Sequence, residues 1–130
     1  MTRICIEQTD RYARISIHGH AGYAKAMGLP AGCDIVCAAV SFLGQVAARR
    51  ILQLAEENMV EVKMFSMQDG SLEMKAIPCA ERGRMELDGI LRTVRTGGEM
   101  LKEAYADFIS LSWGLETGAK GGRNMLRNEM

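Results

Sequence analysis

The sequence lacks a net charge, a long apolar run and a secretion signal. Its 16 basic and 16 acidic side chains cancel to a formal charge of zero, so electrostatics give no reason to expect nucleic-acid binding. No stretch approaches the roughly 18–20 consecutive apolar residues of a membrane span. Residues 1–17 alternate and carry charges, unlike a signal peptide. We therefore expect a cytoplasmic protein with no direct contact to nucleic acid or membrane.

Disulfide bonds are not expected either, although cysteines occur at positions 5, 33, 37 and 79. In the expected compartment these side chains stay as free thiols. A chain of 130 residues with 48% apolar and 25% charged residues suits one ordinary soluble domain. We place this domain at residues 1–112. Residues 113–130 lack apolar periodicity, so we expect a flexible C-terminal tail there.

Alternating segments predict two β-hairpins. Residues 3–7 and 11–18 alternate in the way half-buried strands do. Residues 60–65 and 71–77 flank Gln68-Asp69-Gly70, in which the Asp-Gly pair favours a tight turn. Each pair of segments therefore forms two neighbouring antiparallel strands.

Two longer segments have helical periodicity. Asp34, a strong N-cap, opens the first, which extends to about Asn58, and the second extends from Met85 to about Ser110. The expected buried stripe of the first helix comprises Ile35, Ala38, Ala39, Phe42, Val46 and Leu54. We predict an α+β fold of order β-β-α-β-β-α, with an antiparallel sheet and both helices packed on one face.

Cys37 is the first residue that suggests chemistry. With Asp34 as the cap, Cys37 occupies the third position of the helix, where unpaired N–H groups and the helix dipole favour a thiolate. The thiolate is the nucleophilic form of cysteine. The alternative is a small buried thiol with a packing role only.

Both histidines of the sequence precede this helix. His20 lies just past the second predicted strand, and an imidazole there could pair with the thiol as general base and acid. His18 is the rival base, because strand alternation puts it on the same face. We prefer His20, since it lies in the glycine-rich loop of residues 19–33 whereas His18 lies inside the strand, and loops of this length are commonly functional or mobile.

Two polar residues accompany the pair. Besides capping the helix, Asp34 could orient the imidazole, and Ser41 lies one helical turn after Cys37 and could line the site. A different chemistry would use His18, His20, Cys33 and Cys37 as ligands of a tetrahedral zinc. Their spacing is not the compact spacing of structural zinc sites, so we predict no metal and no other cofactor.

The residues of this region resemble a known family. Gly19-His20-Ala21, the following loop, and Gly32-Cys33-Asp34-Ile35-Val36-Cys37-Ala38-Ala39-Val40-Ser41 are similar to the ribosomal-processing cysteine protease family, Prp. Weaker similarity extends through residues 98–101 and 105–109, so the likeness covers about residues 3–110.

The resemblance implies roles for particular residues. It puts the family's catalytic cysteine on Cys37, its catalytic histidine on His20, and its accompanying glycine, aspartate and serine on Gly19, Asp34 and Ser41. Cys33 departs from the family's pattern and has no role that we can assign.

The resemblance also implies a reaction. Such enzymes remove a short N-terminal extension from large-subunit ribosomal protein number twenty-seven of bacteria, after a pair of aromatic residues, and they form homodimers. A mobile loop between histidine and cysteine admits the substrate, and we expect Tyr23, Met27 and Leu29 of this loop to contact it. The alternative function is a non-catalytic partner-binding or ribosome-assembly module of the same fold.

Overall fold

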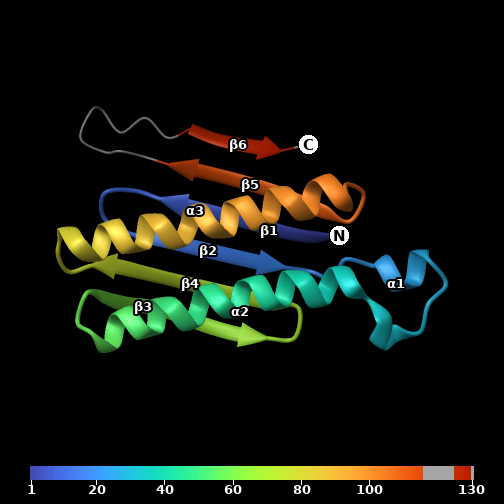
Figure 1. Cartoon of the computed structure of the whole chain (residues 1–130), viewed down its shortest axis with the longest axis horizontal. Helices are drawn as coiled ribbons and strands as arrows, with labels where there is room; N and C mark the ends of the chain where they lie inside the picture. The colour runs from blue at the N-terminus through green and yellow to red at the C-terminus, as the bar shows by residue number, and fades with distance from the viewer. Residues whose placement is uncertain (116–124, 130) are drawn as a thin grey trace.

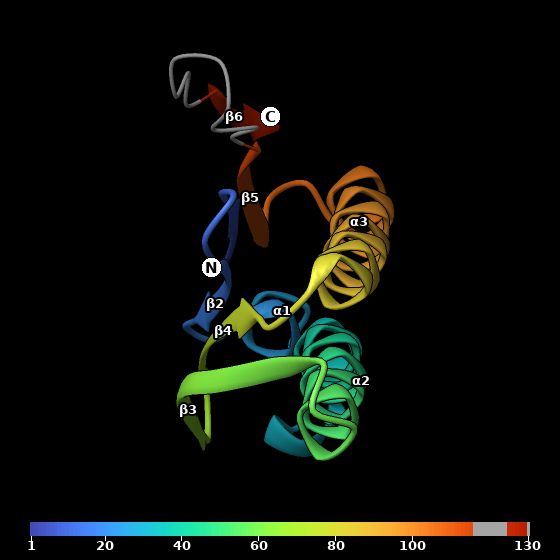
Figure 2. The ribbon, with the colours of Figure 1, turned by 90° about the vertical axis from the view of Figure 1, so that its left-hand side faces the viewer.

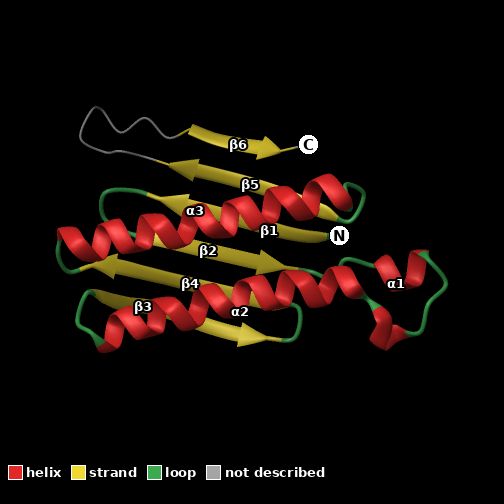
Figure 3. Cartoon of the chain, in the orientation of Figure 1, coloured by secondary structure: helices red, strands yellow, loops and turns green. Residues whose placement is uncertain are grey.

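Two long helices cover one face of a six-stranded sheet in the computed structural model, which describes residues 1–115 and 125–129 (Figures 1 and 3). The elements are β1 (Thr2–Gln8), β2 (Ala13–His18), α1 (Tyr23–Ala26), a 3-10 turn η1 (Ala31–Cys33), α2 (Ile35–Glu56), β3 (Val60–Gln68), β4 (Ser71–Pro78), α3 (Glu81–Ala104), β5 (Ile109–Leu115) and β6 (Met125–Glu129). The predicted α+β class and the placement of both long helices on one face are confirmed (Figure 2).

The sheet has the strand order β3-β4-β2-β1-β5-β6. Both predicted hairpins, β1–β2 and β3–β4, are present, and the antiparallel pairing of β2 with β4 joins them. The expectation of a purely antiparallel sheet is wrong, because β5 lies parallel to β1. Helix α3 makes the crossover that a parallel pairing in one sheet requires.

Strand β5 was not expected. The helical spacing continues through Tyr105 and Phe108, so the sequence predicted a helix to about Ser110, but α3 ends at Ala104. Its start, at Glu81, is one turn earlier than predicted. The predicted domain boundary at 112 falls inside β5, and β6 lies within the predicted tail. The remaining residues of that tail, 116–124 and 130, lie outside the described residues.

Helix α2 packs on the sheet through a different stripe from the one predicted. The stripe is formed by Val36, Val40, Gly44, Ala47, Ala48, Ile51 and Leu54. Of the predicted stripe only Leu54 is buried, whereas Phe42 is 69% and Val46 is 50% exposed. Many small apolar residues make α2 apolar on most of its surface, so the sequence pattern left its rotation poorly determined.

By length and hydropathy alone, α2 could also cross a membrane. In the fold it contributes buried residues to the main core, together with β1, β2, β4 and α3. This is the arrangement of a core helix that retains an apolar outer face.

Candidate active site

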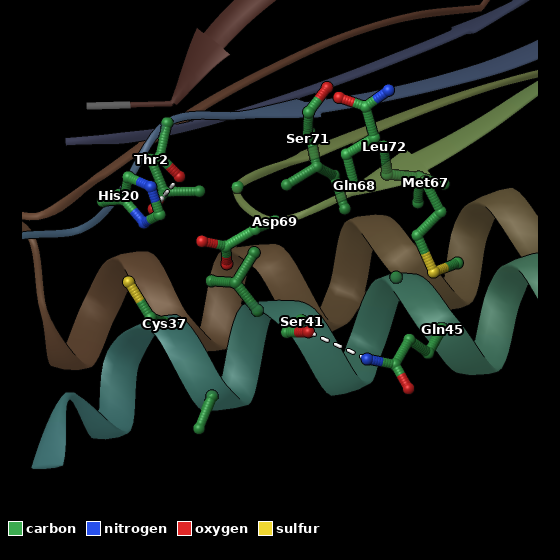
Figure 4. A pocket seen from close by; sticks show the side chains of 16 residues that line it. Thr2, His20, Cys37, Ser41, Gln45, Met67, Gln68, Asp69, Ser71 and Leu72 are labelled. Atoms are coloured by element: carbon green, nitrogen blue, oxygen red, sulfur yellow. Dashed lines mark hydrogen bonds between the residues drawn. The ribbon is translucent and has the colours of Figure 1, made fainter. Parts of the chain in front are cut away.

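A cleft of about 520 Å³ lies between the first half of α2 and the turn that joins β3 to β4 (Figure 4). Its lining residues are Thr2, Ile17, Gly19, His20, Cys37, Ala38, Val40, Ser41, Gly44, Gln45, Met67, Gln68, Asp69, Gly70, Ser71 and Leu72. The structure therefore brings Cys37, His20, Gly19 and Ser41 of the predicted site to one cleft.

Cys37 is the third residue of α2 and is partly buried. The backbone N–H of Ala21 donates a hydrogen bond to its Sγ atom at 3.1 Å. An N–H donor and the positive end of a helix both favour negative charge on the sulfur. Since Ala21 directly follows His20, the same short segment provides both the imidazole and the N–H group that bonds the thiol.

Asp34 caps α2, as predicted. Its Oδ1 accepts from the Cys37 N–H at 2.9 Å, and its Oδ2 accepts from the Ala24 N–H at 3.2 Å. Burial tends to raise the pKa of this carboxyl, but the hydrogen bonds from Cys37 and Ala24 outweigh it, so the pKa lies below its usual value. Both carboxylate oxygens accept hydrogen bonds from backbone amides. The geometry therefore gives Asp34 a capping role and no contact with the imidazole.

The two histidines do not share a face, contrary to the prediction. Gly19 has a φ of 95°, which ends the strand alternation between them. His20 turns into the cleft and its ring lies against Gly70, where a Cβ atom would be 2.8 Å from the ring Nε2. Gly19 itself has no space for a side chain, since a Cβ would be 2.6 Å from the carbonyl oxygen of Met1.

His18 belongs to a hydrogen-bonded cluster of side chains that β2 and β4 share. Its Nε2 bonds the Glu73 carboxylate, and its Nδ1 lies 3.1 Å from the Ser71 hydroxyl. Glu73 also accepts from Arg14 and Ser16. Burial raises the pKa of Glu73, and the bonds from His18, Arg14 and Ser16 lower it further than burial raises it. These contacts give His18 a structural role in joining the strands.

Ser41 lies on α2 one turn after Cys37 and lines the cleft. Its Oγ accepts a hydrogen bond from Gln45 Nε2 at 3.0 Å, and Gln45 lines the cleft one turn further along (Figure 4). Cys37, Ser41 and Gln45 therefore follow one face of the helix, which forms the floor of an elongated cleft.

Comparison with known proteins identifies the family of this chain. The family model described as "Cysteine protease Prp" matches residues 1–110. The chain belongs to the Prp family. It is therefore a cysteine protease. Among curated proteins, no sequence matches this chain.

Three solved structures share the fold. The essential ribosomal processing protease Prp from S. aureus, in complex with a covalently linked product peptide, has a TM-score of 0.62 at 20% identity, over 87% of this chain and 99% of that chain. SMU.848 from Streptococcus mutans has a TM-score of 0.60 at 22% identity, over 89% and 96%. The S. aureus protease with a substrate peptide gives 0.58 at 18% identity, over 87% and 99%.

The residues expected to contact substrate lie elsewhere in this Prp chain. Tyr23 packs edge-to-face against Tyr105 and Phe108, with ring centroids 5.5 and 5.4 Å apart. Met27 and Leu29 are 53% and 44% exposed, and none of the three lines the cleft. The aromatic contacts instead attach the loop that contains α1 to the end of α3.

The β3–β4 turn is the part of the cleft that sequence reasoning missed. The Asp-Gly pair predicts only a hairpin, yet Asp69 and Gly70 both line the Prp cleft. The sequence holds no signal for this proximity, because the turn lies far along the chain from both His20 and Cys37.

The zinc alternative finds no support in the geometry. Within residues 1–115, no group of three His, Cys, Asp or Glu side chains could hold a metal ion. His18 bonds with Glu73 and Ser71, whereas His20 lines the cleft, so the four suggested ligands do not converge. All four cysteines are free thiols, and Cys33 is exposed.

Proposed function

We propose that this chain is an endopeptidase that removes a short N-terminal extension from bacterial large-subunit ribosomal protein number twenty-seven. Cys37 is the nucleophile and His20 the general acid and base. The observation that carries the proposal is the shared cleft, in which the residue after His20 donates its N–H to Cys37 Sγ at the start of a helix. The activity of the Prp family supplies the reaction class.

The chemistry has two stages. The Cys37 thiolate attacks the scissile carbonyl carbon and forms a C–S bond, while the His20 imidazolium donates its proton to the amide nitrogen as the C–N bond breaks. The neutral imidazole then takes a proton from water, and the hydroxide attacks the thioester. The C–S bond breaks and the thiolate–imidazolium pair is restored. Backbone N–H groups at the start of α2 would stabilise the oxyanion.

The nature of the substrate is supported by shape and by relatives. The cleft is elongated and partly apolar, with Ile17, Val40 and Leu72 among its lining residues, which suits an extended peptide with apolar side chains. The S. aureus relative is described as a ribosomal processing protease and was solved with a substrate peptide. A ribosomal substrate would be met in the cytoplasm, where we propose that the enzyme works.

The nucleophile is tested by replacing Cys37 with Ser and incubating the protein with a peptide that carries the ribosomal-protein extension. We expect kcat/KM to fall on the order of 10³-fold or more, measured by mass spectrometry of the products. Cys33→Ser is the matched control, because Cys33 is exposed and does not line the cleft. Undiminished cleavage by Cys37→Ser would refute the assignment. Binding without turnover by the unaltered chain would instead favour the partner-binding module.

The role of His20 is tested through the reactivity of the thiol. We expect His20→Ala to slow the alkylation of Cys37 by iodoacetamide near neutral pH, because the thiolate loses its imidazolium partner. His18→Ala should change this rate less, since the His18 ring bonds Glu73 and Ser71 and does not line the cleft. Equal effects of the two substitutions would contradict the dyad.

We further propose that the enzyme is a homodimer that buries the outer face of its helical layer. Exposed Phe42 and Val46 on α2 and exposed Met85 on α3 make this face apolar. A groove of about 640 Å³ lies between the two helices and includes Leu43, Val46 and Ile90 among its lining residues. Apolar surface of this kind commonly marks a protein interface.

A further inference from the structure

The β3–β4 turn forms the wall of the cleft that faces α2. Gln68, Asp69, Gly70 and Ser71 all line the cleft, so the whole turn contributes to the site (Figure 4). Gly70 has a φ of 75°, which explains why a glycine suits this turn. The positive φ of Gly70 does not by itself explain why the turn packs on the His20 imidazole.

Gly70 provides the surface on which the His20 ring lies. A Cβ atom at this position would be 2.8 Å from Nε2 and 2.9 Å from Cε1 of the ring, closer than real Cβ atoms approach other atoms. The N–H of Gly19 donates to the carbonyl oxygen of Gly70 at 2.9 Å. The residue before His20 is thus tied to the same glycine that contacts its ring.

Asp69 supplies a carboxylate beside this contact. Figure 4 shows its side chain turned toward the end of the cleft that holds His20 and Cys37. Asp69 is exposed, and neither its carboxylate nor the His20 ring has a hydrogen-bond partner within the described residues. The carboxylate and the imidazole can therefore form a hydrogen bond with each other when a substrate fills the cleft.

Contacts of the neighbouring residues hold the turn in place. The Ser71 hydroxyl bonds His18, and His18 bonds Glu73, so the first residue of β4 is tied to the last residue of β2. His20 follows β2 by two residues, and Asp69 precedes β4 by two. The same strand pairing therefore sets the separation of the imidazole and the carboxylate.

We propose that Asp69 is a positioning residue for His20. Its carboxylate accepts an N–H of the imidazolium, fixes the orientation of the ring and stabilises its charge, while Gly70 leaves the space that the ring occupies. A catalytic hydrogen bond of this kind is often long or open in the free enzyme and tightens around bound substrate. The inference rests on the proposed Cys37–His20 dyad.

The ionisable groups around His20 come from three segments. Cys37 lies on α2, Asp69 lies in the turn, and the amino group of Met1 donates to the His20 carbonyl oxygen at 2.8 Å. Asp34 bonds the Cys37 amide and completes the set. Of the two carboxylates, Asp34 has both oxygens bonded to backbone amides, so Asp69 is the one that can serve the imidazolium.

The first test replaces Asp69 with Asn and measures kcat against pH, because this profile reports the groups of the enzyme–substrate complex. Loss of the negative charge destabilises the imidazolium, so we expect the basic limb of the kcat profile to move to lower pH by about 0.5–1 unit, and kcat at its optimum to fall about tenfold. Asp10→Asn makes the same charge change in the β1–β2 turn, at the opposite end of the molecule (Figure 1), and should leave the profile in place.

The outcomes separate this inference from the proposed function. If Cys37→Ser still cleaves, the dyad itself is refuted. If cleavage depends on Cys37 and His20 but Asp69→Asn leaves the basic limb where it was, only the positioning role is refuted. A change in thermal stability without a change in the pH profile of kcat would also count against it.

The second test uses Gly70→Ala, which adds a Cβ against the imidazole. Gly28→Ala is the matched variant for backbone strain, because Gly28 has a similar φ of 70° but open space around the added Cβ. We expect the loss of kcat/KM in Gly70→Ala to exceed that in Gly28→Ala by about tenfold or more at a similar loss of thermal stability. Equal losses would show that Gly70 serves the turn alone.

Discussion

Asp34 shows how a single side chain connects folding with reactivity. Its carboxylate caps α2 and at the same time bonds the Ala24 amide in α1, so it fixes both the nucleophile and the loop that leads to it. The sequence predicted the cap because Asp34 stands immediately before an apolar-periodic segment. It could not predict the bond to Ala24, since α1 is too short to have a sequence pattern of its own.

The cap leads to a prediction about stability. Asp34→Ala should lower the free energy of unfolding by about 1 kcal/mol near neutral pH. Because hydrogen bonds lower the pKa of Asp34 in the folded state, this contribution is present above its usual pKa and is lost as the pH falls toward the folded-state value. Denaturant titrations at several pH values measure the difference.

The control for this prediction is Asp107→Ala. Asp107 is exposed and has no hydrogen-bond partner within the described part of the chain. Its replacement should change the stability little at any of these pH values. A loss in Asp34→Ala that does not shrink on acidification would contradict the assigned cause.

The histidines show where residue-level prediction stopped. Sequence reasoning ranked His20 above His18 from its position in the loop, and the structure adds that His18 bonds Glu73. The relation between the two rings was predicted wrongly, because a positive φ at Gly19 changes the direction of the side chains that follow. A glycine in a sequence allows that conformation but does not require it.

At the scale of elements, the hairpins and the first long helix were predictable because their patterns are local. Strand β5 was missed for the opposite reason. Ile109, Leu111 and Trp113 alternate and are buried, yet Tyr105 and Phe108 just before them extend the helical spacing. Only the pairing with β1, more than 100 residues earlier in the sequence, decides whether these residues form a strand or continue the helix.

Helix α3 offers a direct test of how the elements pack. A Cβ on Gly83 would overlap the carbonyl oxygen of Met59, in the connection between α2 and β3, whereas a Cβ on Gly89 would meet nothing within 4 Å. Gly83→Ala should therefore lower the free energy of unfolding by about 1–3 kcal/mol. Gly89→Ala should raise it by about 0.5–1 kcal/mol, because alanine favours a helix.

These two variants share one helix and one chemical change, so denaturant unfolding of both separates packing from helix propensity. If both variants gained stability, the close approach of α3 to the Met59 carbonyl would be disproved. If both lost stability to the same extent, propensity and packing would have been assigned wrongly.

At the scale of the whole molecule, the two faces of the helical layer have different structural roles. The inner face builds the core, and the outer face carries exposed apolar side chains that we assign to a dimer. Phe42→Glu should produce a monomer in sedimentation velocity measurements, because burying a charge at an apolar interface is unfavourable. Phe65→Glu, on the edge strand β3, should remain a dimer; a dimer in both variants would place the interface elsewhere.

The parallel pairing of β1 with β5 also governs when the cleft is completed. Thr2 pairs with Ile109, and its N–H donates a hydrogen bond to the Phe108 carbonyl oxygen at 3.0 Å. Thr2 also lines the cleft. A growing chain that has been translated through β4 already contains every cleft residue, yet its strand β1 is paired with β2 alone until β5 follows. Closing a segment this long is slow, so the protease completes its site only after residues 109–115 have been synthesised and have paired with β1.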